Sequence, residues 1–284
     1  MQKIGIGYLK RKMIDKILRK IIEKQIVGDD VAILMGGGAD SATLLFTCLR
    51  LNKKPHGYSF YIEGQPSYDS KKAEEICKIF DVPFTPIPLP KDNLVDDFKL
   101  LAKKYKCRKK THFECIWPFI YTFPKIKEKY VTTGVGADSH YVLSKKGMMH
   151  FKQTIQLMDE YRHDYFHQEN PGALDQLKQF CDEYDKTLCV PYFEKEVYDY
   201  FYGKSWDEIN RPYQKYLIKS KFSEFEKIKV KPHVNYQLCA GIPELFETLL
   251  DNKRINLYNR TRIMDVCRDW WKLNNSKSTL EEFL

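Results

Sequence analysis

Three consecutive glycines followed by an aspartate and a serine form the segment of this chain best suited to chemistry. They are Gly36, Gly37, Gly38, Asp40 and Ser41, and they stand between a short apolar run and a helical pattern. Glycines let the backbone turn tightly and bring bare N–H groups close to a ligand. A helix that begins directly behind them adds oriented N–H donors and the positive end of its dipole, so the segment predicts an anion site.

The aspartate in this glycine segment narrows the kind of anion site. A carboxylate repels phosphate unless a divalent cation stands between them, so Asp40 indicates a Mg²⁺ ligand. The segment is neither a Walker A loop nor a dinucleotide fingerprint, because it lacks the lysine of the first and the glycine spacing of the second. The alternative that these residues leave open is a glycine turn in which Asp40 and Ser41 only cap the following helix.

A second segment with glycines and one aspartate follows another apolar run. Residues 132–139 read TTGVGADS and include Thr133, Gly134 and Asp138. In a doubly wound sheet, ligands bind at the carboxyl ends of strands, in the crevice where the strand order reverses. Two strand-end loops with one aspartate each therefore predict a site that holds Mg²⁺ on a polyphosphate.

Alternating strand and helix patterns position these two segments. Pro83 and Pro86 confine the third strand pattern to a sheet edge. Strands separated by helices of this length imply right-handed βαβ units, so we expect an α/β fold with a mostly parallel sheet flanked by helices. Residues 1–150 are expected to form the nucleotide-binding domain, and residues 151–284 a mainly helical region that completes the site. The strand patterns cover residues 31–35, 57–62, 82–87 and 130–133, and the helical patterns cover residues 8–26, 44–49, 73–80, 94–105, 243–250 and 261–273.

The two glycine segments resemble those of a known family, the N-type ATP pyrophosphatases or PP-loop superfamily. Residues 36–41 are similar to its Ser-Gly-Gly-x-Asp-Ser loop, and residues 133–138 to the Thr-Gly-Glu-Gly-Ala/Ser-Asp segment of the asparagine synthetase synthetase domain. Residues 190–196 look like that domain's Val-Pro-Phe-Leu-Asp segment, and residues 214–219 look like its Lys-x-x-Leu-Arg helix. The resemblance implies the adenine nucleotide alpha hydrolase-like α/β fold.

The same resemblance implies an ATP- and Mg²⁺-dependent ligase or amidotransferase. An acceptor carboxylate or amide oxygen would attack the α-phosphate, pyrophosphate would leave, and a nitrogen nucleophile would then displace AMP to form a C–N bond. Asp40 and Asp138 would ligate Mg²⁺, and Lys215 would place a positive charge on the α-phosphate. Asp138 and Lys215 are the catalytic candidates that the resemblance supplies. The residues expected to bind the nucleotide are Gly36, Gly37, Gly38, Asp40, Ser41, Ser59, Thr133 and Gly134. His140, two residues after Asp138, is a further catalytic candidate for substrate contact or acid–base work.

Departures from the family's pattern bear on the acceptor and on the nitrogen source. Gly36 replaces the first serine, while Val135 and Ser139 stand where the family has glutamates, the first of them on the acceptor and amine side. The glutaminase domain is also missing, since Gln2 rather than a cysteine follows Met1. We therefore expect nitrogen from free ammonia, a substrate amine or a separate ammonia-supplying subunit.

Two other functions are compatible with the same residues. The acceptor can be a base in tRNA or DNA instead of a small molecule, and the net charge of +9 agrees with a nucleic-acid partner. Tyr and Phe interleave with Lys around residues 184–225, a pattern that suits base stacking but also an aromatic core beneath lysines. The changes at Gly36, Val135 and Ser139 fit, as a third function, a catalytically weakened ATP- or AMP-binding interaction protein.

Composition excludes several protein classes. No run approaches the ~18 apolar residues that a membrane span requires, and the N-terminus has no secretory signal, so we expect a cytoplasmic protein without a membrane partner. The eight cysteines form no Cys-x-x-Cys pair, which favours free thiols. The stretch from Cys107 to Cys115 has zinc-like residue types without paired spacing, and His163 and His167 have a chelating spacing without an evident third ligand.

Overall fold

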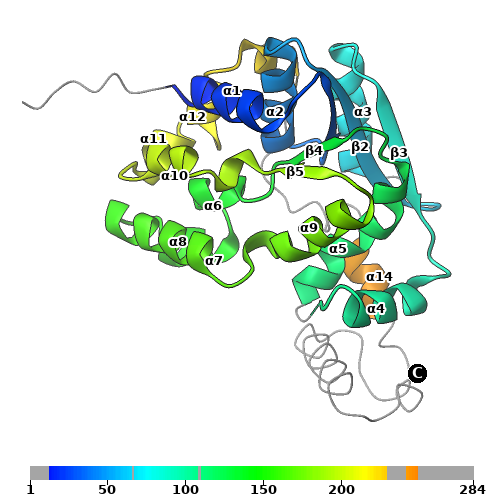
Figure 1. Cartoon of the computed structure of the whole chain (residues 1–284). Coiled ribbons are helices and arrows are strands. Elements are labelled where there is room, and N and C mark those ends of the chain that lie inside the picture. The colour runs from blue at the N-terminus through cyan, green and yellow to red at the C-terminus, as the bar shows by residue number, and fades with distance from the viewer. Residues whose placement is uncertain (1–12, 66, 108–109, 229–240, 249–284) are drawn as a thin grey trace, which may run out of the picture.

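A computed structural model describes residues 13–65, 67–107, 110–228 and 241–248 of the 284-residue chain (Figure 1). At its centre lies a five-stranded sheet in which every pair of neighbouring strands is parallel, in the order β3-β2-β1-β4-β5. Helices cover both faces of this sheet, which confirms the predicted α/β fold class. The strands are β1 (Asp30–Leu34), β2 (Lys54–Ile62), β3 (Phe84–Leu89), β4 (Tyr130–Thr133) and β5 (Thr187–Cys189).

The helices have the following bounds. The α-helices are α1 (Ile14–Gln25), α2 (Ala39–Arg50), α3 (Tyr68–Ile79), α4 (Leu94–Lys103), α5 (Lys110–Thr122), α6 (Ala137–Tyr141), α7 (Lys145–His150), α8 (Ile155–His167), α9 (Leu174–Glu183), α10 (Lys195–Phe201), α11 (Trp206–Asn210), α12 (Tyr216–Lys219) and α14 (Ile242–Thr248). Short 3₁₀ turns occupy Phe123–Lys125, Pro171–Ala173, Pro191–Phe193 and Ser223–Lys227.

Strand β1 divides the hydrophobic core into two layers. Val31 and Ile33 pack in the layer that contains α1, α2 and α3, whereas Ala32 packs in the layer of α4, α5 and α9. Successive side chains of a strand point to opposite faces, so a strand buried on both faces needs the unbroken apolar run seen here. The carboxyl end of β1, where the three glycines begin, is thereby fixed in the middle of the molecule.

Helix α1 uses its apolar stripe for packing. Ile14, Leu18 and Ile22 are fully buried against α2 and the rest of that layer, while the lysines between them face outward. The basic N-terminal pattern is therefore a packed helix with a solvated face. Residues 8–12 of that pattern lie outside the described residues.

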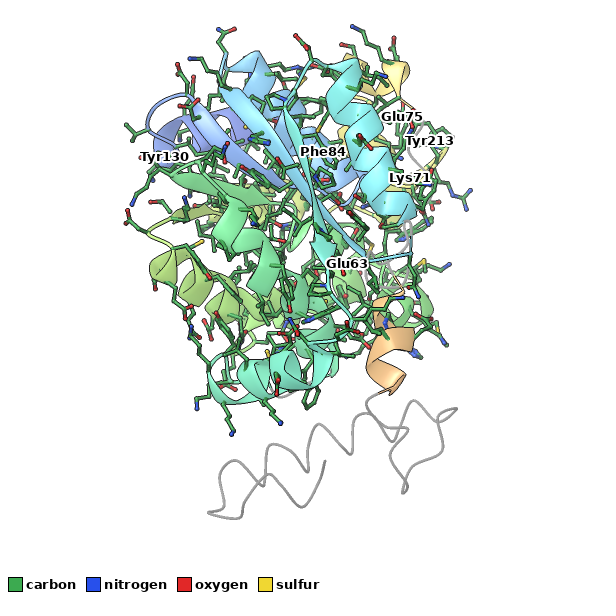
Figure 2. All side chains as sticks on the ribbon, turned by 90° about the vertical axis from the view of Figure 1, so that its right-hand side faces the viewer. Glu63, Lys71, Glu75, Phe84, Tyr130 and Tyr213 are labelled. Atoms are coloured by element: carbon green, nitrogen blue, oxygen red, sulfur yellow. The ribbon has the colours of Figure 1, made fainter. Side chains whose placement is uncertain are left out.

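The edge strand of the sheet and the helix that packs on it are those that the sequence pattern predicts. Strand β3 is the edge strand that Pro83 and Pro86 predict, and it pairs with β2. Helix α3 packs on β2 and β3, and Lys71 and Glu75 project from its exposed side (Figure 2). Ser67 caps this helix, because its hydroxyl accepts the Ser70 N–H.

Two elements differ from the sequence expectation. Strand β5 lies within residues 151–284, where strand signal is weak, because three residues are too few to show a period. Helix α5 carries no clean polar face, since Trp117 and Phe113 are buried within it, and Pro118 lies in its interior. The sheet thus extends past residue 150, and the proposed boundary there stays a prediction. The helix expected at residues 261–273 lies outside the described residues.

None of the helices in the described part of the chain is long and apolar enough to cross a membrane.

Candidate functional site

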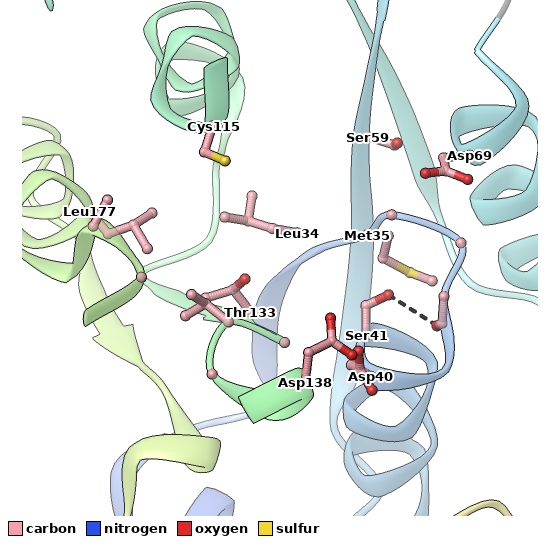
Figure 3. A pocket seen from close by; sticks show the side chains of 18 of the residues that line it. Leu34, Met35, Asp40, Ser41, Ser59, Asp69, Cys115, Thr133, Asp138 and Leu177 are labelled. Atoms are coloured by element: carbon pink, nitrogen blue, oxygen red, sulfur yellow. Dashed lines mark hydrogen bonds between the residues drawn. The ribbon is translucent and has the colours of Figure 1, made fainter. Parts of the chain in front are cut away.

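A cavity of about 770 Å³ opens where β1 and β4 end side by side. Residues 36–41, which follow β1, and Thr133, Gly134, Val135 and Asp138, which follow β4, line it together. The chain continues from β1 toward β2 and later returns on the other side of β1 as β4, so this is the switch point of the sheet. In Figure 3, Asp40 and Asp138 approach each other from α2 and α6 below this cavity.

Gly134 allows the two loops to touch. A Cβ atom at this position would lie 2.9 Å from the Asp40 Cβ and 3.2 Å from the Ser41 nitrogen, closer than carbon atoms pack. A side chain here would therefore push the second loop away from α2. Gly37 is required for another reason, because its φ of +66° is a left-handed conformation that favours glycine.

The backbone at the start of α2 faces the cavity. Gly38 is the N-cap residue, and no side chain caps the helix there. A Cβ at Gly38 would meet no heavy atom within 4 Å, so the space beside it is open. Ser41 Oγ lies 3.4 Å from the Gly38 carbonyl oxygen, back along its own helix. The Ser41 hydroxyl thus lies at a carbonyl oxygen of its own helix, and the Asp40 carboxylate contacts Lys215.

Lys215 joins the two loops by contacting both aspartates. Its Nζ lies 2.6 Å from Asp40 Oδ2 and 2.8 Å from Asp138 Oδ1, and the lysine is only 4 % exposed. Burial acts to lower the pKa of Lys215, but the two carboxylates outweigh it and raise that pKa. The side chain of Lys215 is therefore a buried ammonium that the two carboxylates hold in place.

The backbone of Lys215 is itself held in an unusual conformation. Its φ is +63°, and its N–H donates to Asn210 Oδ1 at 3.0 Å. Asn210 Nδ2 in turn donates to the Tyr141 carbonyl oxygen at 3.0 Å, which ties the start of α12 to the end of α6. The Tyr141 ring also lies beneath Lys215, with its centroid 5.2 Å from Nζ. These contacts explain how a lysine 175 positions after Asp40 reaches it.

Most of the other residues expected to bind a nucleotide also line the cavity. Ser59 at the middle of β2, Thr133 and Gly134 are among them, as are the three glycines and Ser41. Ser59 and Asp69 lie on one side of the cavity in Figure 3, and Cys115 and Leu177 on the other. The structure brings the expected set together at one place. Their roles stay proposals.

His140 is the exception and requires a correction. Its ring is fully buried between Phe166 and Phe201, with ring centroids 4.5 and 4.9 Å away, and it is not among the residues that line the cavity. Nε2 donates to the Tyr192 carbonyl oxygen at 2.7 Å. Burial lowers the pKa of His140 to about 3, so the imidazole is neutral. Asp138 and His140 lie two residues apart on α6, which turns them to different sides of that helix.

Sequence reasoning missed the wall of the cavity opposite Ser59. This wall comes from α5, which the sequence does not predict, and from α8, α9 and the segment between them, so no motif marks it. None of its described members is Asp, Glu, Lys or Arg: Thr111, His112, Cys115, Ile116, Phe119, Tyr165, Gln168, Asn170 and Leu177.

The two metal-like spacings do not build a metal site. Cys107 is buried in the core whereas Cys115 lines the cavity, so the two thiols lie in different parts of the structure. His163 and His167 stack on each other with ring centroids 4.2 Å apart. Across the described residues, no cluster of three or more His, Cys, Asp or Glu side chains is suited to hold a metal.

Asp40 and Asp138 carry the hard oxygen ligands that Mg²⁺ prefers, and Mg²⁺ usually takes one or two protein carboxylates and completes its shell with water and phosphate oxygens. The point that both carboxylates face is occupied here by the Lys215 ammonium. Mg²⁺ on these two aspartates therefore stays a proposal.

The sheet order and the glycine loop at its switch point define a doubly wound α/β protein. No family model matches the chain, and no curated protein matches it. Among solved structures, it shows a distant likeness to a predicted subunit of a tRNA methyltransferase from Methanocaldococcus jannaschii. That pair is 15% identical with a TM-score of 0.34 and covers 60% of this chain and 73% of that one. The U34-tRNA thiolase NcsA from Methanococcus maripaludis is 12% identical with a TM-score of 0.30, over 92% and 78% of the two chains.

Proposed function

We propose that this chain is an ATP-dependent, AMP-forming enzyme of the PP-loop type. The observation that carries the proposal is the convergence of Asp40, Asp138 and Lys215 beside a three-glycine loop at the switch point of a parallel sheet. The bare N–H groups of that loop and the start of α2 suit the phosphates of ATP. Ser59, which lies on β2 and lines the same cavity, is suited to contact the adenosine of ATP.

The residues supply the charges that adenylation needs. An acceptor oxygen attacks the α-phosphorus, the bond to the bridging oxygen of the β-phosphate breaks, and pyrophosphate leaves with the electron pair. Lys215 balances charge on the α-phosphate and on the departing pyrophosphate. Mg²⁺ on Asp40 and Asp138 would neutralise the phosphates further. A nucleophile then adds to the activated carbon, and AMP leaves with the former acceptor oxygen.

Among the described residues, the cavity wall from α5, α8 and α9 carries no Asp, Glu, Lys or Arg side chain, which favours an uncharged acceptor. Val135 also replaces the glutamate that the resemblance would place on this side. A free amino acid such as aspartate brings an ammonium and two carboxylates, and burying charges without partners is costly. A planar amide or lactam carbonyl has no such cost. We therefore propose a nucleobase of tRNA or DNA as the acceptor, in agreement with the chain's net charge of +9.

A carboxylate acceptor, as in an asparagine synthetase-like C–N ligase, is the second candidate. Lys219 favours it, because this lysine lines the same cavity. Burial, together with the charge of Lys215, lowers the pKa of Lys219, and a carboxylate ligand would stabilise its ammonium. Free ammonia or a separate subunit would then supply the nitrogen.

Product analysis tests the proposal. The purified chain is incubated with MgATP and ammonia as the nucleophile, together with tRNA, single-stranded DNA or a panel of small carboxylic acids. AMP and pyrophosphate are expected in the nucleic-acid arms, and AMP in the carboxylate arm alone selects the second candidate. Release of ADP would exclude adenylation. Nucleotide binding without turnover in every arm would instead indicate an ATP- or AMP-binding interaction protein.

A further inference from the structure

Two exposed tyrosines stand beside the cavity without a packing role that explains them. Tyr213 is 50 % exposed and Tyr216 is 37 % exposed, and their ring centroids lie 5.3 Å apart at an interplanar angle of 85°. The residues between them, Gln214 and Lys215, line the cavity. Tyr141 and Tyr192, which also lie near Lys215, are by contrast fully buried. Neither ring lines the cavity itself, but the pair adjoins the lining residues Gln214 and Lys215, and we call this edge of the cavity the rim.

Positive charge accompanies the tyrosine pair. Lys219 Nζ lies 5.4 Å from the centroid of the Tyr213 ring, on the next turn of the chain. Lys219 also lines the cavity, as does Tyr68 at the start of α3, which is 40 % exposed. Positive charge and exposed aromatic rings thus both occur where residues 213–219 meet the cavity.

We propose that Tyr213 and Tyr216 form a stacking platform for bases of a single-stranded nucleic acid whose reacting base enters the cavity. This inference rests on the proposed function and names the surface that holds its substrate. An enzyme that reacts with a base must take it out of the stack, which leaves the neighbouring bases without a partner. Exposed tyrosine rings replace that partner, and lysines beside them attract the phosphates.

The platform explains why aromatic residues and the central lysine belong to one short segment. Lys215 is held by Asn210 immediately between the two tyrosines. A strand stacked on Tyr213 and Tyr216 would follow the rim over Gln214, and its next base would face the cavity. A protein partner is less suited to this surface, because the exposed tyrosines are accompanied by the ammonium of Lys219 rather than by exposed aliphatic side chains.

Fluorescence anisotropy with labelled oligonucleotides tests the platform. The probes are an unstructured single-stranded RNA, the same sequence as DNA, and the RNA annealed to its complement. We expect both single strands to bind, more weakly as salt rises, and the duplex to bind less. The Tyr213→Ala, Tyr216→Ala double variant should bind single strands at least ~10-fold more weakly, because stacking contributes about 1–3 kcal/mol per base.

Two matched variants separate stacking from folding. Tyr213→Phe with Tyr216→Phe keeps the rings and should bind within about 2-fold of the original chain, since stacking uses the ring face. Tyr202→Ala removes a tyrosine that is 60 % exposed on another helix end and should not change binding. Equal binding by the double alanine variant, or tighter binding of the duplex, would overturn the platform. Product analysis with the original chain is scored separately, so that absence of AMP would count against the proposed function alone.

Discussion

The side chain of Asn210 accepts the backbone N–H of Lys215, and this contact holds a left-handed lysine at the meeting point of two aspartates. Asn210 is 2 % exposed, and its amide nitrogen donates to the Tyr141 carbonyl oxygen. It touches no cavity wall and therefore acts as a positioning residue for Lys215.

Replacing Asn210 should affect turnover more than nucleotide binding. Asn210→Ala removes two buried hydrogen bonds, each worth about 1 kcal/mol, and releases the lysine backbone. We expect kcat for AMP release to fall about 10-fold or more while the KM for ATP changes little, since the glycine loop is untouched. Asn210→Asp keeps the accepting oxygen and should restore part of kcat. Equal losses in both variants would point to general destabilisation instead.

Lys215→Met should abolish turnover and make stability depend on Mg²⁺. Losing a charge that balances the transition state typically costs at least about 100-fold in kcat. The two aspartates are then left facing each other, at a cost on the order of 2 kcal/mol, below that of a fully buried pair because the Asp138 side chain is 37 % exposed. Mg²⁺ supplies the missing charge, so thermal melting of the variant should rise with added Mg²⁺ more than that of the original chain. An equal rise in both would argue against a cation site between the aspartates.

Gly134→Ala should lower stability, whereas Gly38→Ala should not. A Cβ at position 134 would lie 2.9 Å from the Asp40 Cβ, and one at position 38 would meet nothing within 4 Å. Overpacking of this kind costs about 1–3 kcal/mol. Urea unfolding of the two variants measures the difference, and similar midpoints would contradict the close approach of the two loops.

Acid should destabilise the fold through His140. The pKa of His140 is about 3 in the folded chain and about 6.5 in the unfolded chain. Between these two values the unfolded chain binds a proton at this residue and the folded chain does not, so a falling pH favours unfolding. Native stability from this group is complete above pH 6.5 and decreases as the pH falls toward 3. The loss reaches about 2 kcal/mol by pH 5. His140→Gln keeps a donor for the Tyr192 carbonyl oxygen and should show a smaller decrease in urea-unfolding free energy between pH 7 and pH 5. Parallel decreases in both proteins would assign the acid sensitivity to other groups.

The two glycine loops and four of the strands could be predicted from local signals in the sequence, whereas the place of Lys215 beside Asp40 and Asp138 followed only from the family resemblance. Strand β1 is an unbroken apolar run, and β3 carries prolines that exclude a central place. The direction of a side chain on a single-turn helix is different, since α6 is too short to show a period, and this is why His140 was misplaced. The wall from α5 was missed because a helix buried on most sides has no amphipathic pattern.

Lys215 enters the chain 175 residues after its partner Asp40. During synthesis from the N-terminus, the sheet from β1 to β4 and both glycine loops are made well before this lysine leaves the ribosome. Chains that end before α12 lack this lysine, so Asp40 and Asp138 would face each other without the ammonium that contacts both of them in the full chain. Such truncated chains are expected to hold the two glycine loops together less firmly at the place where the nucleotide would bind.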